Sequence, residues 1–269
     1  MLIVGERINT SRKAIEPAVR DRDVEFIQKL AKDQVDAGAT YIDVNAGTLV
    51  SGEPEALEWL VKTVQAAVDA PLCFDSPSAV AIERAVAVYD FSRGKPMINS
   101  ITAEKDRFDA ILPLVKKYNT KVVALCMDDT GIQQDAEKRY EVAKNLVNQL
   151  AAAGIALDDI YVDPLTFPIG TGSDVGLAML RIIEGIKNEY PGIHIIAGIS
   201  NISQGLPIRK LLNQAMTVLS MGKGMDAAII DPMDRYLMAL IASTRALLGQ
   251  DDFCMDYITL SRGGKFEGL

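Results

Sequence analysis

The chain has 269 residues, of which 49% are hydrophobic and 24% charged, and its net charge is −8. This acidic balance argues against nucleic-acid binding, which needs a basic surface to neutralise phosphates. No apolar stretch reaches the roughly 18 residues of a membrane span. Three scattered cysteines without a Cys-x-x-Cys or Cys/His pair argue against a bound structural metal. Because the opening MLIVGER is too short for a secretory signal, we expect a cytoplasmic protein.

Eight short apolar runs alternate with segments of helical hydrophobic period. The apolar runs predict strands at 2–9, 41–44, 71–74, 97–98, 122–125, 160–162, 193–197 and 227–230. The periodic segments predict helices at 23–37, 54–68, 78–88, 105–118, 135–153, 174–189, 208–219 and 234–248.

The predicted strands are too apolar to alternate between a wet and a dry face, which indicates a parallel sheet covered on both sides. Eight strand–helix units at intervals of roughly 30 residues close most simply as a (β/α)₈ TIM barrel. A doubly wound open sheet is the alternative. No linker divides the chain, so we expect one domain over residues 1–269. Residues 250–269 form a C-terminal extension, which we expect to be an irregular lid, a cap or a dimer arm.

Polar side chains recur where the predicted strands end. Because the carboxyl ends of all barrel strands lie on one face, these side chains are expected to meet in one site, with Asn201 at its centre. A single Asp after a strand can also have a purely structural role, as a helix cap or a turn residue. The only histidine, His194, begins a strand and is expected at the opposite, structural face. The polar strand-end residues are Glu6, Asn9, Asp43, Asn45, Asp75, Asn99, Asp128, Asp163, Asn201 and Asp231.

The chemical type of this set is carboxylate, carboxamide and hydroxyl, with little that is cationic. The absence of lysine from the strand ends counts against a Schiff-base enzyme. No glycine-rich phosphate loop follows the last strands. The set suits a neutral, amide-rich heterocycle, because a carboxylate accepts two parallel N–H bonds and amides supply both donors and acceptors.

Six short motifs carry a resemblance to a known family. They are GERIN, DVNAG, FDS, INS, VDPL and GISNIS, at 5–9, 43–47, 74–76, 98–100, 162–165 and 198–203. Because these motifs occur in this order, residues 1–248 resemble the methyltetrahydrofolate:corrinoid methyltransferases, which are pterin-binding TIM barrels. Its length resembles the stand-alone members, such as the methyltransferase of a glycine betaine demethylation system.

The resemblance implies roles for individual residues. Asn201 would hydrogen-bond N5, the pterin nitrogen that gains or loses the methyl group. The residues implied to anchor the aminopyrimidinone edge are Asp75, Asn99 and Asp163. Those implied to support the pocket or contact the substrate's tail are Ser200, Gln204 and Arg209. Those implied to form a second layer that fixes the others are Glu6, Asn9, Asp43 and Asn45.

The resemblance also implies an activity and its partners. The substrate would be tetrahydrofolate or methyltetrahydrofolate, and the methyl group would pass to or from a corrinoid (cobalamin) carried by a partner protein. We expect the direction from methylcorrinoid to tetrahydrofolate, and a homodimer. The alternatives are an enzyme like dihydropteroate synthase, a non-catalytic folate-binding protein and a metal-free isomerase barrel. A synthase would end its seventh strand with a Ser-Arg-Lys cluster, whereas this chain has GISNIS.

Overall fold

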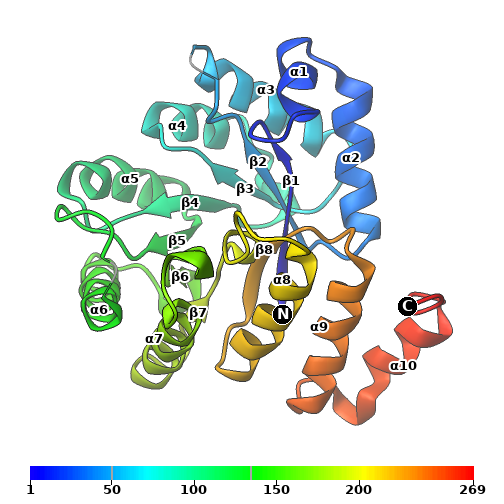
Figure 1. Ribbon diagram of the computed structural model, residues 1–269. Coiled ribbons are helices and arrows are strands. Elements are labelled where there is room, and N and C mark those ends of the chain that lie inside the picture. The colour runs from blue at the N-terminus through cyan, green and yellow to red at the C-terminus, as the bar shows by residue number, and fades with distance from the viewer. Residues whose placement is uncertain (50, 134) are drawn as a thin grey trace.

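Eight parallel strands form the centre of the molecule, and helices lie around them (Figure 1). The computed structural model describes residues 1–49, 51–133 and 135–269. Neighbouring strands follow the order β7-β6-β5-β4-β3-β2-β1-β8. The strands are β1 Leu2–Asn9, β2 Tyr41–Asn45, β3 Leu72–Asp75, β4 Met97–Ile101, β5 Lys121–Leu125, β6 Ile160–Asp163, β7 His194–Ile195 and β8 Ala227–Ile230.

The seam between β7 and β8 closes the sheet into a barrel. The β7 ladder is short, and the chain just beyond it meets β8 through a parallel bridge between Gly198 and Ile229. The Ile229 amide also donates to the Ala197 carbonyl at 2.9 Å. The (β/α)₈ prediction is therefore confirmed, and the open-sheet alternative is wrong.

The helices surround this barrel, and each predicted helix is present. Four of them begin directly after the predicted first residue, whose side chain caps the helix by accepting a backbone N–H from three residues later. These caps are Asp23, Ser78, Asp135 and Asp234. The eight helices are α2 Val24–Asp36, α3 Glu53–Gln65, α4 Ala79–Ala87, α5 Lys105–Tyr118, α6 Ala136–Ala152, α7 Val175–Glu189, α8 Arg209–Gly222 and α9 Arg235–Leu247.

Within the described ranges, two further α-helices lie outside the sequence prediction. The first, α1 (Ile15–Arg20), has only six residues, too few for a clear helical period. The second, α10 (Met255–Arg262), lies in the C-terminal extension beside α9 (Figure 1). An ion pair of 3.1 Å between Arg245 and Asp256 joins α10 to α9. The helix contradicts the irregular lid, whereas a cap or a dimer arm stays a prediction for residues 250–269.

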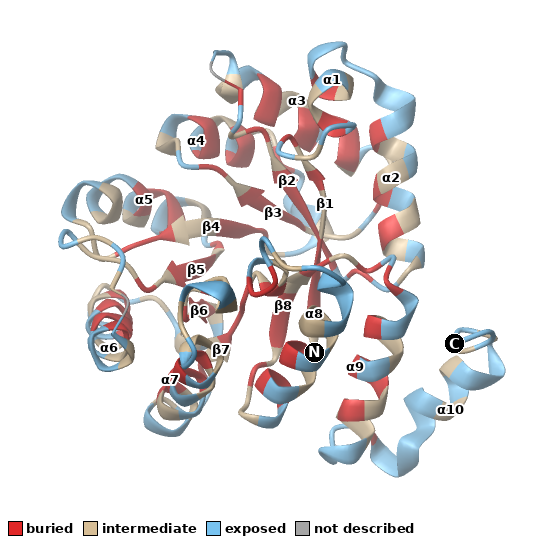
Figure 2. Cartoon of the chain, viewed as in Figure 1, coloured by how far each residue is buried: buried red, intermediate tan, exposed pale blue. Residues whose placement is uncertain are grey.

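Burial closes the interior of the barrel on the side where the strands begin. Buried residues fill the strands and the inner sides of the helices (Figure 2). One layer, with a residue from each strand or its direct continuation, packs inside the barrel near the amino ends of the strands. Its members are Val4, Tyr41, Cys73, Met97, Val123, Tyr161, Ile196 and Ala227. Among the helices in the described ranges, none is long and apolar enough to cross a membrane.

Candidate active site

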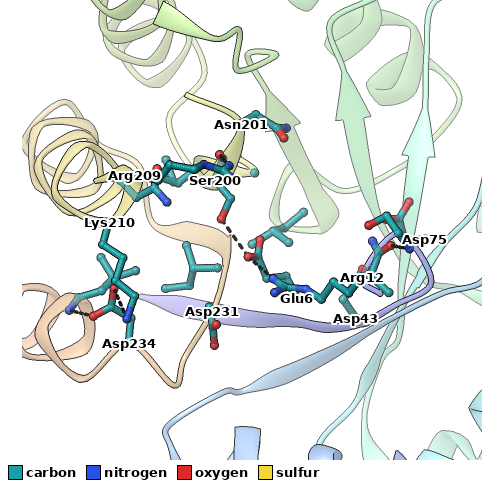
Figure 3. A pocket seen from close by; sticks show the side chains of 18 of the residues that line it. Glu6, Arg12, Asp43, Asp75, Ser200, Asn201, Arg209, Lys210, Asp231 and Asp234 are labelled. Atoms are coloured by element: carbon teal, nitrogen blue, oxygen red, sulfur yellow. Dashed lines mark hydrogen bonds and ion pairs between the residues drawn. The ribbon is translucent and has the colours of Figure 1, made fainter. Parts of the chain in front are cut away.

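A cavity of about 600 Å³ lies at the carboxyl ends of the strands (Figure 3). Strands β1–β4, β6 and β8, the turn after β7 and the first turns of α8 all contribute to its wall. The expected convergence of the polar strand ends is present at this mouth of the barrel. The predicted polar residues that line it are Glu6, Asn9, Asp43, Asp75, Asn99, Asp163, Ser200, Asn201, Arg209 and Asp231.

Three predicted residues lie outside the cavity lining. Asn45 stands behind it and donates from Nδ2 to Asp75 Oδ2 at 2.7 Å. Gln204 is exposed on the turn that carries Asn201, and only its backbone N–H contacts that residue, at 3.1 Å from the Asn201 carbonyl. Asp128 closes a local turn by accepting from the amide and the hydroxyl of Thr130, at 3.0 and 2.6 Å. The expectation that Asp128 joins the site is therefore wrong.

Three carboxylates form the floor of the cavity. Burial raises the pKa of Asp75 to about 6, and the hydrogen bond from Asn45 opposes this rise. Burial likewise raises the pKa of Asp163 to about 6, against the hydrogen bond from the Leu165 amide at 2.8 Å. Burial and the nearby Asp75 charge raise the pKa of Asp43 well above its ordinary value. Charged groups whose pKa values shift this way in a cleft are typical of functional sites.

Asp43 also has an unused acceptor. Its side chain is 1% exposed, and Oδ1 has no hydrogen-bond partner among the described residues. A buried acceptor without a partner costs on the order of 1–3 kcal/mol, so a group that supplies a donor to this cavity recovers that cost. The floor is therefore prepared for a ligand that carries N–H groups.

Glu6 connects the first strand to the turn after β7. Its Oε1 accepts from Ser200 Oγ at 2.9 Å and from an Arg12 guanidinium nitrogen at 2.7 Å. Burial raises the pKa of Glu6, while Arg12 and Ser200 oppose that rise. On the other side of the turn, Arg209 donates to the Ser200 carbonyl at 2.5 Å and to Ser203 Oγ at 3.0 Å. These bonds fix the turn in place across the mouth.

Asn201 is presented by a short 3₁₀ turn, Ile199–Asn201, directly after the barrel seam. It is exposed to the cavity, and its side-chain amide makes no hydrogen bond within the described ranges. Gly198 leaves room for it, because a Cβ there would lie 3.3 Å from Asn201 Nδ2. The turn therefore offers a free donor and acceptor to whatever occupies the mouth.

The cavity also contains residues that the strand-end pattern does not reveal. Ser11 and Arg12 lie in the loop after β1, beyond the last strand residue. Lys210 and Asn213 lie on the inner side of α8, and Asp234 caps α9. Three cations thus line the wall, namely Arg12, Arg209 and Lys210, and only Arg209 among them was implied by the resemblance. One signal could have identified the α8 residues as part of the cavity wall. Residues three or four apart share one side of a helix, as Arg209, Lys210 and Asn213 do directly after the strand-seven turn.

The donor set of this cavity is suited to hydrogen bonding. No group of three or more His, Cys, Asp or Glu side chains in the described ranges is arranged to hold a metal ion. Acceptors on the floor, a free amide on the turn and cations toward α8 can together orient a planar, amide-rich molecule with an anionic substituent.

Comparison with known proteins agrees with this chemistry. Residues 5–231 match the family model of pterin-binding enzymes. The chain is 39% identical over 267 residues to the methylcorrinoid:tetrahydrofolate methyltransferase of Eubacterium limosum. The aligned region covers 98% of this chain and 97% of that protein. It is 28% identical to the methionine synthase of Mycobacterium tuberculosis over 87% of this chain, but spans only 21% of that longer protein.

Solved structures extend the likeness at the level of the fold. The dihydropteroate synthase of Vibrio fischeri superposes with a TM-score of 0.69 at 18% identity, with 93% of each chain covered. The synthase of Thermus thermophilus in complex with 6HMPPP gives 0.67 at 18% identity, over 89% of this chain and 91% of that one. These identities show a shared barrel alone. Together with the sequence matches, they establish that the chain belongs to the pterin-binding enzymes and, within them, to the methyltransferases related to the Eubacterium limosum protein.

Proposed function

We propose that the protein moves a methyl group between N5 of tetrahydrofolate and the cobalt of a corrinoid, with the pterin held in the mouth of the barrel. The observation that carries this proposal is the pairing of a buried acidic floor with the unbonded amide of Asn201 in one cavity. The methylcorrinoid:tetrahydrofolate methyltransferase of Eubacterium limosum supports it, because the two chains match over almost their full lengths.

The floor is suited to the pterin's aminopyrimidinone edge. That edge carries two parallel N–H donors, which a carboxylate such as Asp75 or Asp163 accepts together. Asn99 adds an amide that can pair with a ring nitrogen or the carbonyl. The bond from Asn45 orients the Asp75 carboxylate, so this acceptor is fixed before the substrate arrives.

Asn201 is proposed to act at N5. In transfer to tetrahydrofolate, the N5 lone pair attacks the methyl carbon, and the cobalt–carbon bond breaks with its electron pair left on cobalt, which goes from Co(III) to Co(I). N5 gains positive charge and then releases its proton to solvent. The Asn201 carbonyl oxygen accepts the N5–H bond, which strengthens as the charge develops, so the amide stabilises the transition state without titrating.

The direction and the partners complete the proposal. We propose that the physiological transfer runs from methylcorrinoid to tetrahydrofolate and that a partner protein carries the corrinoid to the mouth. We further propose that residues 1–269 act as one domain and assemble as a homodimer. The same transition state serves both directions, so the relative free energies of the methyl carriers decide which one dominates.

The test has a binding stage and a transfer stage. Calorimetric titration with tetrahydrofolate and with 5-methyltetrahydrofolate measures binding. Anaerobic mixing of protein, tetrahydrofolate and methylcob(III)alamin is then followed by absorbance and product analysis. We expect binding of both folates and equal amounts of cob(I)alamin and 5-methyltetrahydrofolate. Binding without transfer would indicate a folate-binding protein that is not an enzyme, and absence of binding would reject the pterin site.

A further inference from the structure

The inner side of α8 presents a set of side chains that the proposed methyl transfer does not use. Lys210 and Asn213 line the cavity from the first turns of this helix, next to Arg209. Figure 3 shows Arg209 and Lys210 on one side of the cavity and Asp75 on the other. The cations of α8 are therefore separated from the acidic floor, and each end of the cavity suits a different part of a ligand.

Asn213 has an acceptor that nothing in the described chain uses. Its Oδ1 is buried and has no hydrogen-bond partner among the described residues. The bond from Thr217 Oγ1, at 2.8 Å, goes to the Asn213 backbone carbonyl and leaves the side chain free. A buried amide oxygen in a cavity wall is therefore available for an N–H group from a ligand.

Lys210 has only a loose contact with its nearest carboxylate. Its Nζ lies 3.9 Å from Asp234 Oδ2, beyond hydrogen-bond distance, and its side chain is 75% exposed. Asp234 is held by other donors, namely Gln214 Nε2 at 3.1 Å and the Leu237 amide at 3.2 Å. Lys210 can therefore turn toward a ligand anion while Asp234 keeps these hydrogen bonds.

Building on the proposed function, we propose that this side of α8 is the subsite for the p-aminobenzoylglutamate tail of tetrahydrofolate. Asn213 Oδ1 accepts an N–H of the tail, and the Lys210 ammonium binds a glutamate carboxylate. The groups along the tail follow the same order as the side chains along the cavity wall. From the pterin outward, the tail carries first N–H groups and then terminal carboxylates. Correspondingly, the Asn213 Oδ1 atom is buried in the wall, and the exposed Lys210 side chain lies one helical turn away. Added glutamates place more carboxylates near the same ammonium, so Lys210 favours folates with longer tails.

The experiment compares three ligands in calorimetric titrations: 6-methyltetrahydropterin, which has no tail, tetrahydrofolate with one glutamate, and tetrahydrofolate with three. Lys210→Gln is expected to weaken one-glutamate binding about fivefold, three-glutamate binding more strongly, and the tailless pterin not at all. Asn213→Leu is expected to weaken both folates equally, by about fivefold, again without affecting the pterin.

Lys223→Gln is the matched control, because it removes the same charge at the other end of α8, where Lys223 pairs with Glu184 at 2.9 Å. It is expected to bind all three ligands like the wild type. Folding is a minor concern for Lys210→Gln, since removing a cation from a helix N-terminus is neutral or favourable.

Equal folate affinities in wild type and Lys210→Gln would overturn the tail subsite, as would an equal loss for the tailless pterin. Failure of the wild type to bind any of the three ligands would instead overturn the proposed function, so the two failures are distinguishable.

Discussion

The His194 cluster at the base of the barrel and the acidic floor at its mouth hold their carboxylates in different ways. At the base, where the strands begin, charges are paired: His194 Nδ1 lies 3.0 Å from Asp226 Oδ2, and Lys187 reaches the same oxygen at 2.7 Å. At the mouth, Asp43 Oδ1 and Asn213 Oδ1 are buried without partners within the described residues, and Asp43 keeps a raised pKa.

This difference indicates what each end contributes. Base groups stabilise one another, so their effect is on folding. Mouth groups cost free energy in the empty protein, and a ligand with complementary donors recovers it. Substitutions at the mouth should therefore change binding or transfer, whereas substitutions at the base should change stability alone.

Removal of the amide at Asn201 is expected to have the largest effect. Asn201→Ala should bind tetrahydrofolate almost normally but transfer methyl on the order of 100-fold more slowly, because it loses the bond that strengthens in the transition state. Single-turnover transfer from methylcob(III)alamin at saturating tetrahydrofolate measures this. Wild-type turnover in the variant would remove Asn201 from the mechanism.

Asp163→Asn should make the empty protein more stable. Burial raises the pKa of Asp163 from 3.8 to about 6, so its ionised form destabilises the fold, partly at pH 4–6 and fully above that. Asn keeps an acceptor for the Leu165 amide and removes the charge. At pH 7.5 we expect a gain of about 1–3 kcal/mol in the free energy of unfolding, together with weaker folate binding.

Urea denaturation at pH 7.5 and at pH 4 tests this expectation, because the gain should be largely absent at the lower pH. A loss of stability at pH 7.5 would show that the Asp163 carboxylate is a stabilising group, contrary to the contrast between the two ends.

Gly198→Ala should slow transfer with a smaller effect than loss of the amide itself. The added Cβ would lie 3.3 Å from Asn201 Nδ2, so the amide must move by a few tenths of an ångström. We expect roughly a tenfold loss of transfer rate with near-normal binding. Gly176→Ala is the control, since a Cβ there meets nothing within 4 Å. Equal rates in both variants would contradict the tight placement of Asn201.

His194→Gln should have the smallest effect, and on stability only. The hydrogen bond with Asp226 raises the pKa of His194, against the effect of burial. Because the pKa is higher in the folded protein, protonated His194 stabilises the fold. This contribution is complete below about pH 6.5, and it disappears as the pH rises through the pKa of His194 in the folded protein. The variant should therefore lose about 1 kcal/mol near pH 5.5 and less near pH 8.5. Altered folate binding would break the separation between base and mouth.

Much of the fold and of the cavity floor could be predicted from the sequence. Short apolar runs, each followed by a polar residue and a helix cap, define strand ends that the barrel must bring to one face. Asp75, Asn99 and Asp163 are located by this rule alone. Asp128 shows its limit, because an Asp three residues beyond a strand can equally close its own turn.

The α8 side of the cavity could not be predicted in this way. Lys210 and Asn213 stand on a helix, and their approach to the site depends on the barrel closing next to β7. The prediction of a five-residue strand at 193–197 was itself too long, because the chain leaves the ladder after Ile195. It then enters the 3₁₀ turn that carries Asn201. Local pattern identifies residue chemistry, whereas closure decides which helix faces the cavity.

The most direct measurement compares one substitution at the two ends of the barrel. Calorimetric titration with tetrahydrofolate would be run on wild type, on Asp75→Asn at the mouth and on Asp159→Asn at the base, where Asp159 pairs with Lys95. We expect Asp75→Asn to weaken binding at least about tenfold, because an amide places a donor against the pterin's donors. Asp159→Asn should bind like the wild type. Equal affinities in all three proteins would contradict the placement of the folate in the mouth.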